Sequence, residues 1–366
     1  MKMYLLWILM FVIARLILTA IQTLFRKKEF KTRTHIIFII VKLLCSVAFA
    51  ALVMAGPVFL RPVQPVLIAL YAVLFADALA DICYTVFKAA KKTDRRFSHY
   101  QIMSLIFCIL FFAYGTVNMQ IIRPNYHTYT SEKLKEEHKF VFVSDIHVGG
   151  GQNFSTVEKM VENIYAQSPD FIILGGDVTD DFTTKEEMSE TYALFKDSDI
   201  PVYFIYGNHE VQQHPEYSGG ANFSQDEIRE AIESNGIEIL VDEFEEISDD
   251  LILLGRNDVT AGENRLSAEE LKNPSPEKYL VTADHQPVDI KENIKTGTDL
   301  QVSGHTHAGQ LFPLRLLYSL LAPVYGDYEY DGGVIMNVSS GSCGWREPFR
   351  TDSHCHFEVI ELKPAE

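Results

Sequence analysis

Residues 139–147 read KFVFVSDIH, and this stretch joins a short apolar run to two side chains that can bind a metal ion. The run 139–144 predicts a buried strand, because it is short, apolar and rich in Val and Phe. Asp145 and His147 follow it directly. In open α/β sheets, side chains at the carboxyl ends of strands build the site. The stretch therefore predicts a sheet with its chemistry at this edge.

Ligand-type side chains follow four further apolar runs in the same way. The motifs are Gly176-Asp177, Gly207-Asn208-His209-Glu210, His285 and Gly304-His305-Thr306-His307. The predicted strands before them are 171–174, 202–206, 279–282 and 300–303. Each motif alone is a weak signal, since Asp-x-His can cap a helix and Gly-Gly-Asp is common in turns. Their joint occurrence after successive strands indicates one site.

The combined motifs supply enough ligands for two metal ions. A divalent ion in a protein takes about four to six ligands. The seven candidates are Asp145, His147, Asp177, Asn208, His285, His305 and His307. Two ions about 3.5–4 Å apart can stabilise the attacking and leaving oxygens of phosphoryl transfer. The sequence therefore predicts a metal-dependent hydrolase.

The remaining pattern after residue 139 mixes helices with strands. Polar stretches of helical character lie at 155–167, 185–196 and 224–235, and later strands are expected at 237–241, 251–255, 334–338 and 357–362. Alternating strands and helices followed mostly by strands indicate an α/β chain, an α+β sandwich of two sheets flanked by helices.

The amino-terminal third has a different composition. Residues 1–125 hold 15 Lys and Arg against 4 Asp and Glu, whereas the remaining residues hold 17 against 45, a charge of −28. Four apolar runs, at about 3–25, 35–60, 65–87 and 100–122, are each long enough to cross a membrane as a helix. We therefore expect a transmembrane region with four helices at 1–125, a polar connector at 126–138 and a catalytic domain at 139–366.

The charges of the loops predict an orientation. The first and third loops each contain five Lys or Arg, and the second contains only Arg61. Since basic loops stay in the cytoplasm, the catalytic domain is expected on the extracytoplasmic side of the cell membrane. Within the spans, Arg15 and Asp77 are expected at similar depth and to pair, whereas Lys42 is expected to extend toward the nearby cytoplasmic surface.

The motif series Ser-Asp-Ile-His, Gly-Gly-Asp, Gly-Asn-His-Glu, Ala-Asp-His-Gln-Pro and Gly-His-Thr-His-Ala-Gly-Gln resembles the calcineurin-like metallophosphoesterase superfamily. It is most similar to a bacterial membrane-associated branch that includes phosphodiesterases and relatives of UDP-2,3-diacylglucosamine pyrophosphatases. The resemblance covers 139–362 and implies a metallophosphoesterase-type two-sheet sandwich. Glu210 departs from the Asp of many members, and Asp284 before His285 is unusual.

The resemblance implies a role for each ligand. One ion would be bound by Asp145, His147, Asp177 and His307, and the other by Asp177, Asn208, His285 and His305. A hydroxide bridging the metals would attack phosphorus, and His209 would protonate the leaving alkoxide. The family favours Mn, while the ligand types also suit Fe or Zn.

Several residues near the motifs have two interpretations. Asp180 and Asp181 either orient the ligand histidines or cap a helix. Arg346 and Arg350 either bind a substrate phosphate or form surface salt bridges. Cys343 and Cys355 are the only cysteine pair after the spans, and whether they form a disulfide stays open.

The charge of −28 excludes nucleic acid as a partner, since its binding rests on basic contacts to phosphates. An apolar stretch at 315–321 follows the last histidine motif and either borders the site, receiving acyl chains, or packs as an ordinary helix. A membrane-embedded phosphodiesterase or pyrophosphatase acting on a phosphorylated lipid or envelope precursor is therefore expected. The alternatives are a phosphomonoesterase, a phosphoprotein phosphatase, or a non-catalytic membrane sensor with a structural metal site.

Overall fold

The computed structural model describes residues 2–25, 32–55, 63–91, 97–150, 152, 154–196, 199–211, 223–345 and 348–365. These residues form two units. The helical unit comprises Met1–Val117 and Leu311–Leu316, and the sheet unit comprises Asn118–Gln310 and Leu317–Glu366. The basic loops that predict the orientation, around 26–31 and 92–96, lie mostly outside the described residues.

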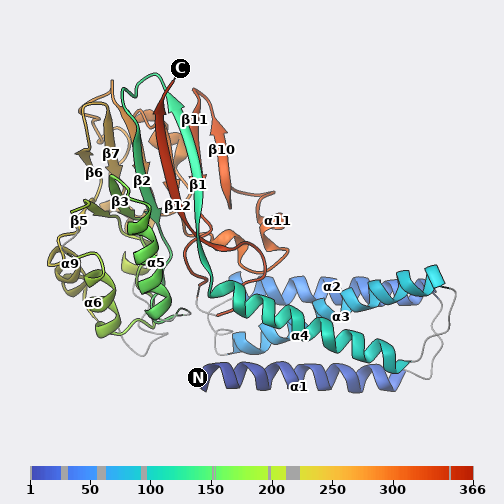
Figure 1. Cartoon of the computed structure of the whole chain (residues 1–366). Coiled ribbons are helices and arrows are strands. Elements are labelled where there is room, and N and C mark those ends of the chain that lie inside the picture. Colours follow the sequence, from blue (N-terminus) through green and yellow to red (C-terminus); the bar gives the residue numbers. More distant parts are fainter. Residues whose placement is uncertain are drawn as a thin grey trace. The chain divides into compact units, whose positions relative to one another are not determined.

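The helical unit is built from four apolar helices, which lie alongside one another (Figure 1). They are α1 (Lys2–Phe25), α2 (Thr32–Ala55), α3 (Gln64–Lys91) and α4 (Phe97–Met119). Three of them contain segments long and apolar enough to cross a membrane, namely His35–Met54, Gln64–Phe87 and Gln101–Met119. The apolar segment found in α1, Leu9–Ile21, is shorter, so the structure supports three candidate spans rather than the four predicted.

Charged side chains meet inside the helical unit. Arg15 Nη1 of α1 lies 3.9 Å from Asp77 Oδ1 of α3, as the predicted pairing requires. The prediction for Lys42 was wrong, because its Nζ lies 2.6 Å from Asp77 Oδ2 and 2.5 Å from Asp81 Oδ2. Asp81, which the sequence analysis did not include, supplies the second carboxylate. A buried pair costs less than an ammonium without a partner in an apolar bundle, so Lys42 turns inward.

The first sheet of the sheet unit has six strands in the order β1-β12-β2-β3-β4-β5. β2, β3, β4 and β5 are parallel to one another, and β12 runs antiparallel to β2. The strands are β1 (Ile122–Ser131), β12 (Cys355–Pro364), β2 (His138–Val143), β3 (Phe171–Leu174), β4 (Val202–Phe204) and β5 (Glu238–Ile239).

The second sheet has the order β10-β11-β9-β8-β7-β6, and its four inner strands are parallel. The strands are β10 (Gly326–Tyr330), β11 (Val334–Val338), β9 (Leu300–Ser303), β8 (Tyr279–Ala283), β7 (Leu251–Gly255) and β6 (Glu243–Glu246). The predicted two-sheet α/β sandwich is therefore confirmed. The predicted strands 171–174, 251–255, 300–303 and 334–338 have the observed bounds.

The two faces of β2 explain how the layers pack. Phe140 and Phe142 point into a core shared with the second sheet, where they join residues such as Leu253 of β7 and Val302 of β9. Val141 and Val143 point the other way, into a core that includes residues of the helices α5 (Phe154–Ala166), α6 (Lys185–Ala193) and α9 (Gln225–Glu233). Alternation along the strand thus builds a sheet covered on both faces.

The segment predicted as a connector is mostly a strand. β1 pairs in parallel with β12 along its full length, from Ile122 to Ser131. Its polar composition and Pro124 concealed it in the sequence. Both are tolerated because β1 is an edge strand, where one side of the backbone needs no partner.

Replacing Asp77 with Asn leaves Arg15 and Lys42 facing one fewer carboxylate in a buried setting. We expect the free energy of unfolding of the full chain in lipid to fall by about 3–5 kcal/mol, the cost of breaking a buried pair. Thermal unfolding followed by circular dichroism measures this. Glu190→Gln, an exposed change in α6, is the control, and an equal effect of both changes would contradict the network.

Candidate metal centre

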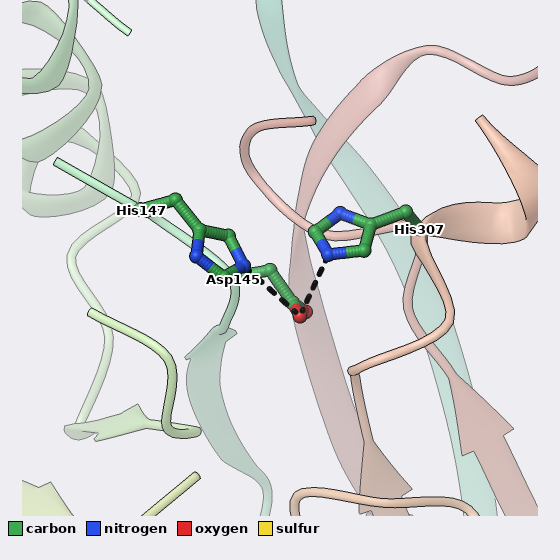
Figure 2. A group of neighbouring side chains, drawn as sticks. All are labelled: Asp145, His147 and His307. Atoms are coloured by element: carbon green, nitrogen blue, oxygen red, sulfur yellow. Dashed lines mark ion pairs between the residues drawn. The ribbon is translucent and has the colours of Figure 1, made fainter. Parts of the chain in front are cut away.

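Three of the predicted ligands meet at the ends of β2 and β9. Asp145 and His147 follow β2, and His307 follows β9; ligand atoms of the three lie within 4.8 Å of one another. Asp145 Oδ1 is 4.0 Å from His147 Nε2 and 3.6 Å from His307 Nε2. Figure 2 shows both imidazole rings turned toward the carboxylate. The spacing leaves room for an ion between the three groups.

A second group forms beside the first. Asp177, His285 and His305, which follow β3, β8 and β9, also bring ligand atoms within 4.8 Å of one another. The rings of His285 and His305 are 5.3 Å apart between centroids. Asn208, at the start of the short helix α7 (Asn208–Val211), follows β4. The ligand types match the second set expected from the sequence.

Asp177 lies between the two groups. Its Oδ2 atom is 3.7 Å from His147 Nε2 of the first group and 3.2 Å from His285 Nε2 of the second. Since Asp177 is 2% exposed, its charge is held inside the protein. A buried carboxylate next to histidines of both groups has the position that a bridging ligand requires.

The backbone at the site adopts an uncommon conformation. Positive φ angles occur at five of the seven predicted ligands: Asp145 (56°), His147 (45°), Asp177 (52°), His305 (69°) and His307 (49°). Such angles are rare for residues other than glycine and concentrate at functional sites. The backbone of these turns therefore adopts an unfavourable conformation at the residues whose side chains form the site.

Two glycines leave the space that this arrangement needs. A Cβ on Gly207 would overlap the carboxylate and backbone of Asp177, and a Cβ on Gly304 would overlap Ser144 and Asp145. Because the contacted atoms belong to the ligand turns themselves, neither neighbour can move without displacing a ligand.

The inward-facing atoms fit bound cations. His147 Nε2, His285 Nε2 and Asn208 Oδ1 are buried and have no hydrogen-bond partner among the described residues. Buried polar atoms are nearly always satisfied, so three orphaned acceptor-type atoms beside two carboxylates call for an external partner. Imidazole nitrogen and carboxylate or amide oxygen are ligands for divalent transition metals.

Outer partners orient the ligand histidines. His285 Nδ1 donates to the Gly175 carbonyl at 2.8 Å, and His307 Nδ1 donates to the Cys343 carbonyl at 3.2 Å. His147 Nδ1 lies 3.1 Å from Asp180 Oδ2, as one of the two interpretations of Asp180 expected. The Nδ1 atoms of His285 and His307 are directed at carbonyls, so Nε2 is the atom of each of these two rings that faces the site.

Glu210 holds two of the ligand turns together, a role that the sequence analysis did not assign. Its Oε2 accepts hydrogen bonds from the backbone N–H groups of Asp177 (2.8 Å) and Gly207 (3.0 Å), and its Oε1 accepts from that of Thr179 (2.9 Å). Glu210 is fully buried and does not belong to the clusters of potential metal ligands found among the described residues. The carboxylate therefore joins the turns after β3 and β4.

Asp284, the other departure from the family pattern, also has a structural partner. Its carboxylate accepts two hydrogen bonds from Arg265, at 2.7 and 3.1 Å, and one from Asn293 at 3.0 Å. Arg265 follows the 3-10 helix η2 (Val259–Asn264). The pair thus fixes this loop next to His285.

His209 lies beside the ligands, with its ring 5.0 Å from that of His147. Its Nδ1 lies 3.5 Å from Asp181 Oδ1, so Asp181 orients this histidine while Asp180 orients His147. Burial lowers the pKa of His209, but Asp177, Asp181 and Asp180 outweigh it and raise that pKa to about 10. The imidazole is therefore held as a proton donor at neutral pH.

The electrostatics differ between ligands. Burial raises the pKa of Asp177, but the charges of His285 and His209 outweigh it and hold that pKa well below its usual value. Burial lowers the pKa of His307 to about 3, against the opposing effect of Asp145. His307 is therefore neutral and Asp177 ionised, the forms in which these groups can bind a metal. Burial lowers the pKa of His285, but Asp177 and Asp145 outweigh it and hold that pKa well above its usual value.

Arg350 shows neither of the two arrangements considered from the sequence, because its partners among the described residues include no carboxylate and its terminal nitrogens are bound to main-chain carbonyls. It is fully buried and donates to the carbonyls of His307 (2.9 Å), Cys343 (2.9 Å) and Ser340 (2.6 Å). The sequence could not show this, because the carbonyls that the two terminal nitrogens of Arg350 bind come from other turns of the chain. Arg346 lies outside the described residues. Cys343 and Cys355 are both buried free thiols.

Comparison with known proteins identifies the domain. Residues 138–309 match the family model described as Calcineurin-like phosphoesterase. The sheet unit carries a calcineurin-like phosphoesterase domain. An uncharacterized metallophosphoesterase of Campylobacter jejuni is 28% identical over 71% of this chain and 69% of its own length. One of Aquifex aeolicus is 29% identical over 71% of the chain and 98% of its own length.

Membrane relatives also match. A transmembrane protein with metallophosphoesterase domain of Danio rerio is 28% identical over 64% of the chain, and the match spans 56% of that relative. Among solved structures, a dimetal phosphatase of Danio rerio aligns over 62% of the chain and 93% of its own, with a TM-score of 0.37 and 12% identity. The chain is thus a metal-dependent phosphoester hydrolase with apolar helices typical of a membrane protein.

Replacing Arg350 with Met separates a structural role from phosphate binding. The change removes Arg350 as a donor to three buried carbonyls, of which those of Cys343 and His307 keep a second donor and that of Ser340 has no other donor among the described residues. A buried carbonyl that loses its donor costs about 1–3 kcal/mol, so we expect lower stability and lower metal content. Arg229→Met in α9, where the side chain is exposed, is the matched control. Unchanged stability with a raised KM would show that Arg350 binds substrate after all.

Proposed function

We propose that this metallophosphoesterase is a membrane-embedded enzyme that uses two divalent cations to hydrolyse a phosphodiester or pyrophosphate bond in a lipid or cell-envelope substrate. The observation that carries the two-metal assignment is the position of Asp177, whose Oδ2 atom lies within 4 Å of a histidine of each ligand group. Asp145, His147, Asp177 and His307 would hold one cation, and Asp177, Asn208, His285 and His305 the other.

The cations would supply an activated hydroxide and neutralise phosphate charge when bound. The residues of the chain hold the ligand side chains in place and supply a proton. Glu210 and Arg350 fix the turns that carry the ligands, and Asp180, Gly175 and Cys343 orient the imidazoles. His209, held protonated by Asp177, Asp181 and Asp180, would donate its proton to the leaving alkoxide. Manganese is the preferred cation by family resemblance, with iron or zinc as the alternatives.

The membrane and charge properties support the substrate class. Helices of membrane-spanning length belong to the same chain as the site, so an envelope or lipid substrate would be presented at the same bilayer. The acidic composition after residue 125 disfavours nucleic acid. Loop charges favour a catalytic domain on the extracytoplasmic side.

The test compares metal-loaded hydrolysis of bis-p-nitrophenyl phosphate with that of p-nitrophenyl phosphate. We expect metal-dependent activity on the diester, and His209→Ala should reduce turnover of a diester with an alkyl leaving group by about 10²-fold or more while metal content is retained. Preferred hydrolysis of the monoester would favour a phosphomonoesterase instead. Full metal binding without activity on either compound would favour the sensor.

The acyl requirement is tested separately. Long-chain and deacylated forms of a phosphodiester or pyrophosphate lipid should differ in kcat/KM, because a lipid-directed enzyme gains binding from the acyl chains. Equal values would remove the lipid assignment and leave the two-metal hydrolase intact.

The pH profile tests the pairing of His209 with Asp181. Since the pKa of His209 is raised to about 10, its proton is present below that pH and is lost above it. Asp181→Asn removes one of the groups that raise the pKa, so the alkaline fall of kcat on the alkyl diester should move to lower pH. Bound cations lower both values, so the difference between variant and parent is the readout. An unchanged alkaline limb would contradict the assignment.

A further inference from the structure

An apolar segment directly follows the turn that carries His305 and His307. Residues 311–321, here called the leucine segment, read LFPLRLLYSLL and contain one charged residue, Arg315. The segment includes the short helix α11 (Leu314–Tyr318). Its first part, Leu311–Leu316, belongs to the helical unit, whereas the chain on both sides belongs to the sheet unit. Six residues from the interior of the sheet unit's sequence are thus part of the helical unit.

The contact with α3 lies deep along that helix. The Tyr71 hydroxyl donates to the Phe312 carbonyl at 2.8 Å, and the Phe75 and Phe312 rings meet edge to face at 5.6 Å between centroids. Tyr71 and Phe75 are seven and eleven residues from the start of α3. At 1.5 Å per residue these positions are about 10 and 16 Å along the helix. A hydrocarbon core is about 30 Å thick, so Phe312 would lie within it.

The backbone of the leucine segment suits an apolar setting. The carbonyl of Phe312 accepts from Tyr71, and Pro313 has no N–H to satisfy. Within the segment, Leu314 N donates to the Leu311 carbonyl at 2.8 Å and Leu321 N to the Tyr318 carbonyl at 2.8 Å. Irregular backbone is tolerated at membrane depth only when such groups find partners in the protein.

The leucines themselves are turned outward. Leu320 and Leu321 are 79% and 86% exposed, the highest values among the large apolar side chains that the structure describes. Comparable exposure occurs on outward-facing residues of the spans, such as Leu44 (64%) and Leu110 (62%). Leu316 and Leu317, at 54% and 43%, extend the patch. Exposed apolar patches of this kind mark contact surfaces.

We propose that the leucine segment inserts into the bilayer, with Leu316, Leu317, Leu320 and Leu321 in contact with lipid acyl chains. The choice of occupant rests on continuity with the candidate membrane spans, because the segment begins on α3 and its exposure matches that of span residues. The catalytic domain is thereby attached to the membrane at a second point besides α4. The proposal concerns the surface alone and does not depend on the reaction that the metal centre performs.

Tryptophan fluorescence in vesicles tests this placement. The full chain is reconstituted in phosphatidylcholine vesicles with or without 6,7-dibromo acyl chains, and the emission of the parent, with its two native tryptophans, is subtracted. We expect the emission of Leu320→Trp to be blue-shifted, to lose most of its intensity in brominated lipid and to resist aqueous acrylamide. Leu321→Trp is a second variant at a site open enough to accept the ring.

The matched control is Leu266→Trp, another exposed leucine of the sheet unit, at 41%. Its emission should be quenched by acrylamide and not by brominated lipid. If the Leu320→Trp and Leu321→Trp variants behave like this control, the leucine segment faces water and the proposal is wrong. Shielding from both quenchers would also overturn it, because a protein partner or a second copy of the chain would then cover the leucines.

Discussion

The burial of Asp177 between two groups of histidines is the constraint around which the sheet unit is built. A carboxylate that is 2% exposed must be matched by positive charge or by hydrogen-bond donors. The backbone N–H of His209 donates to its Oδ1 at 2.9 Å, while Oδ2 faces His147 and His285. The turns that bring His147, His209 and His285 to Asp177 follow β2, β4 and β8, so strands of both sheets must be correctly placed to form the site.

Two polar residues outside the ligand set preserve this geometry. Glu210 accepts backbone hydrogen bonds from the turns after β3 and β4, and Arg350 donates to carbonyls around His307 and Cys343. Five ligand residues have positive φ angles, a conformation that costs energy for non-glycine residues. The hydrogen bonds that Glu210 and Arg350 make to these turns offset that cost. They also hold the turns, and the side chains at the site, in one orientation.

In the helical unit, buried charges determine how the helices pack. Its helices are apolar on all sides, and Lys42, Asp77 and Asp81 form ion pairs between α2 and α3. Such pairs specify which helix faces meet, because any other register would bury an uncompensated charge. The first part of the leucine segment, Leu311–Leu316, belongs to this helical unit.

The sequence by itself determined most of the strands, the types of side chain at the site and the order of the motifs, but it missed the edge strands β1, β6 and β10. Short apolar runs such as 171–174 and 300–303 specify strands, and Asp177, His285 and His305 follow such runs because the carboxyl ends of strands carry the site. Only the tertiary structure decided which partners the long charged side chains and the edge strands have. Whether Arg350 faces substrate or carbonyls, whether Lys42 turns outward or inward, and whether 122–131 pairs with β12 depend on partners that lie far away along the chain. The local sequence does not indicate such distant partners. Whether a charged side chain or an edge strand is buried is decided only when the sheets and helices pack together.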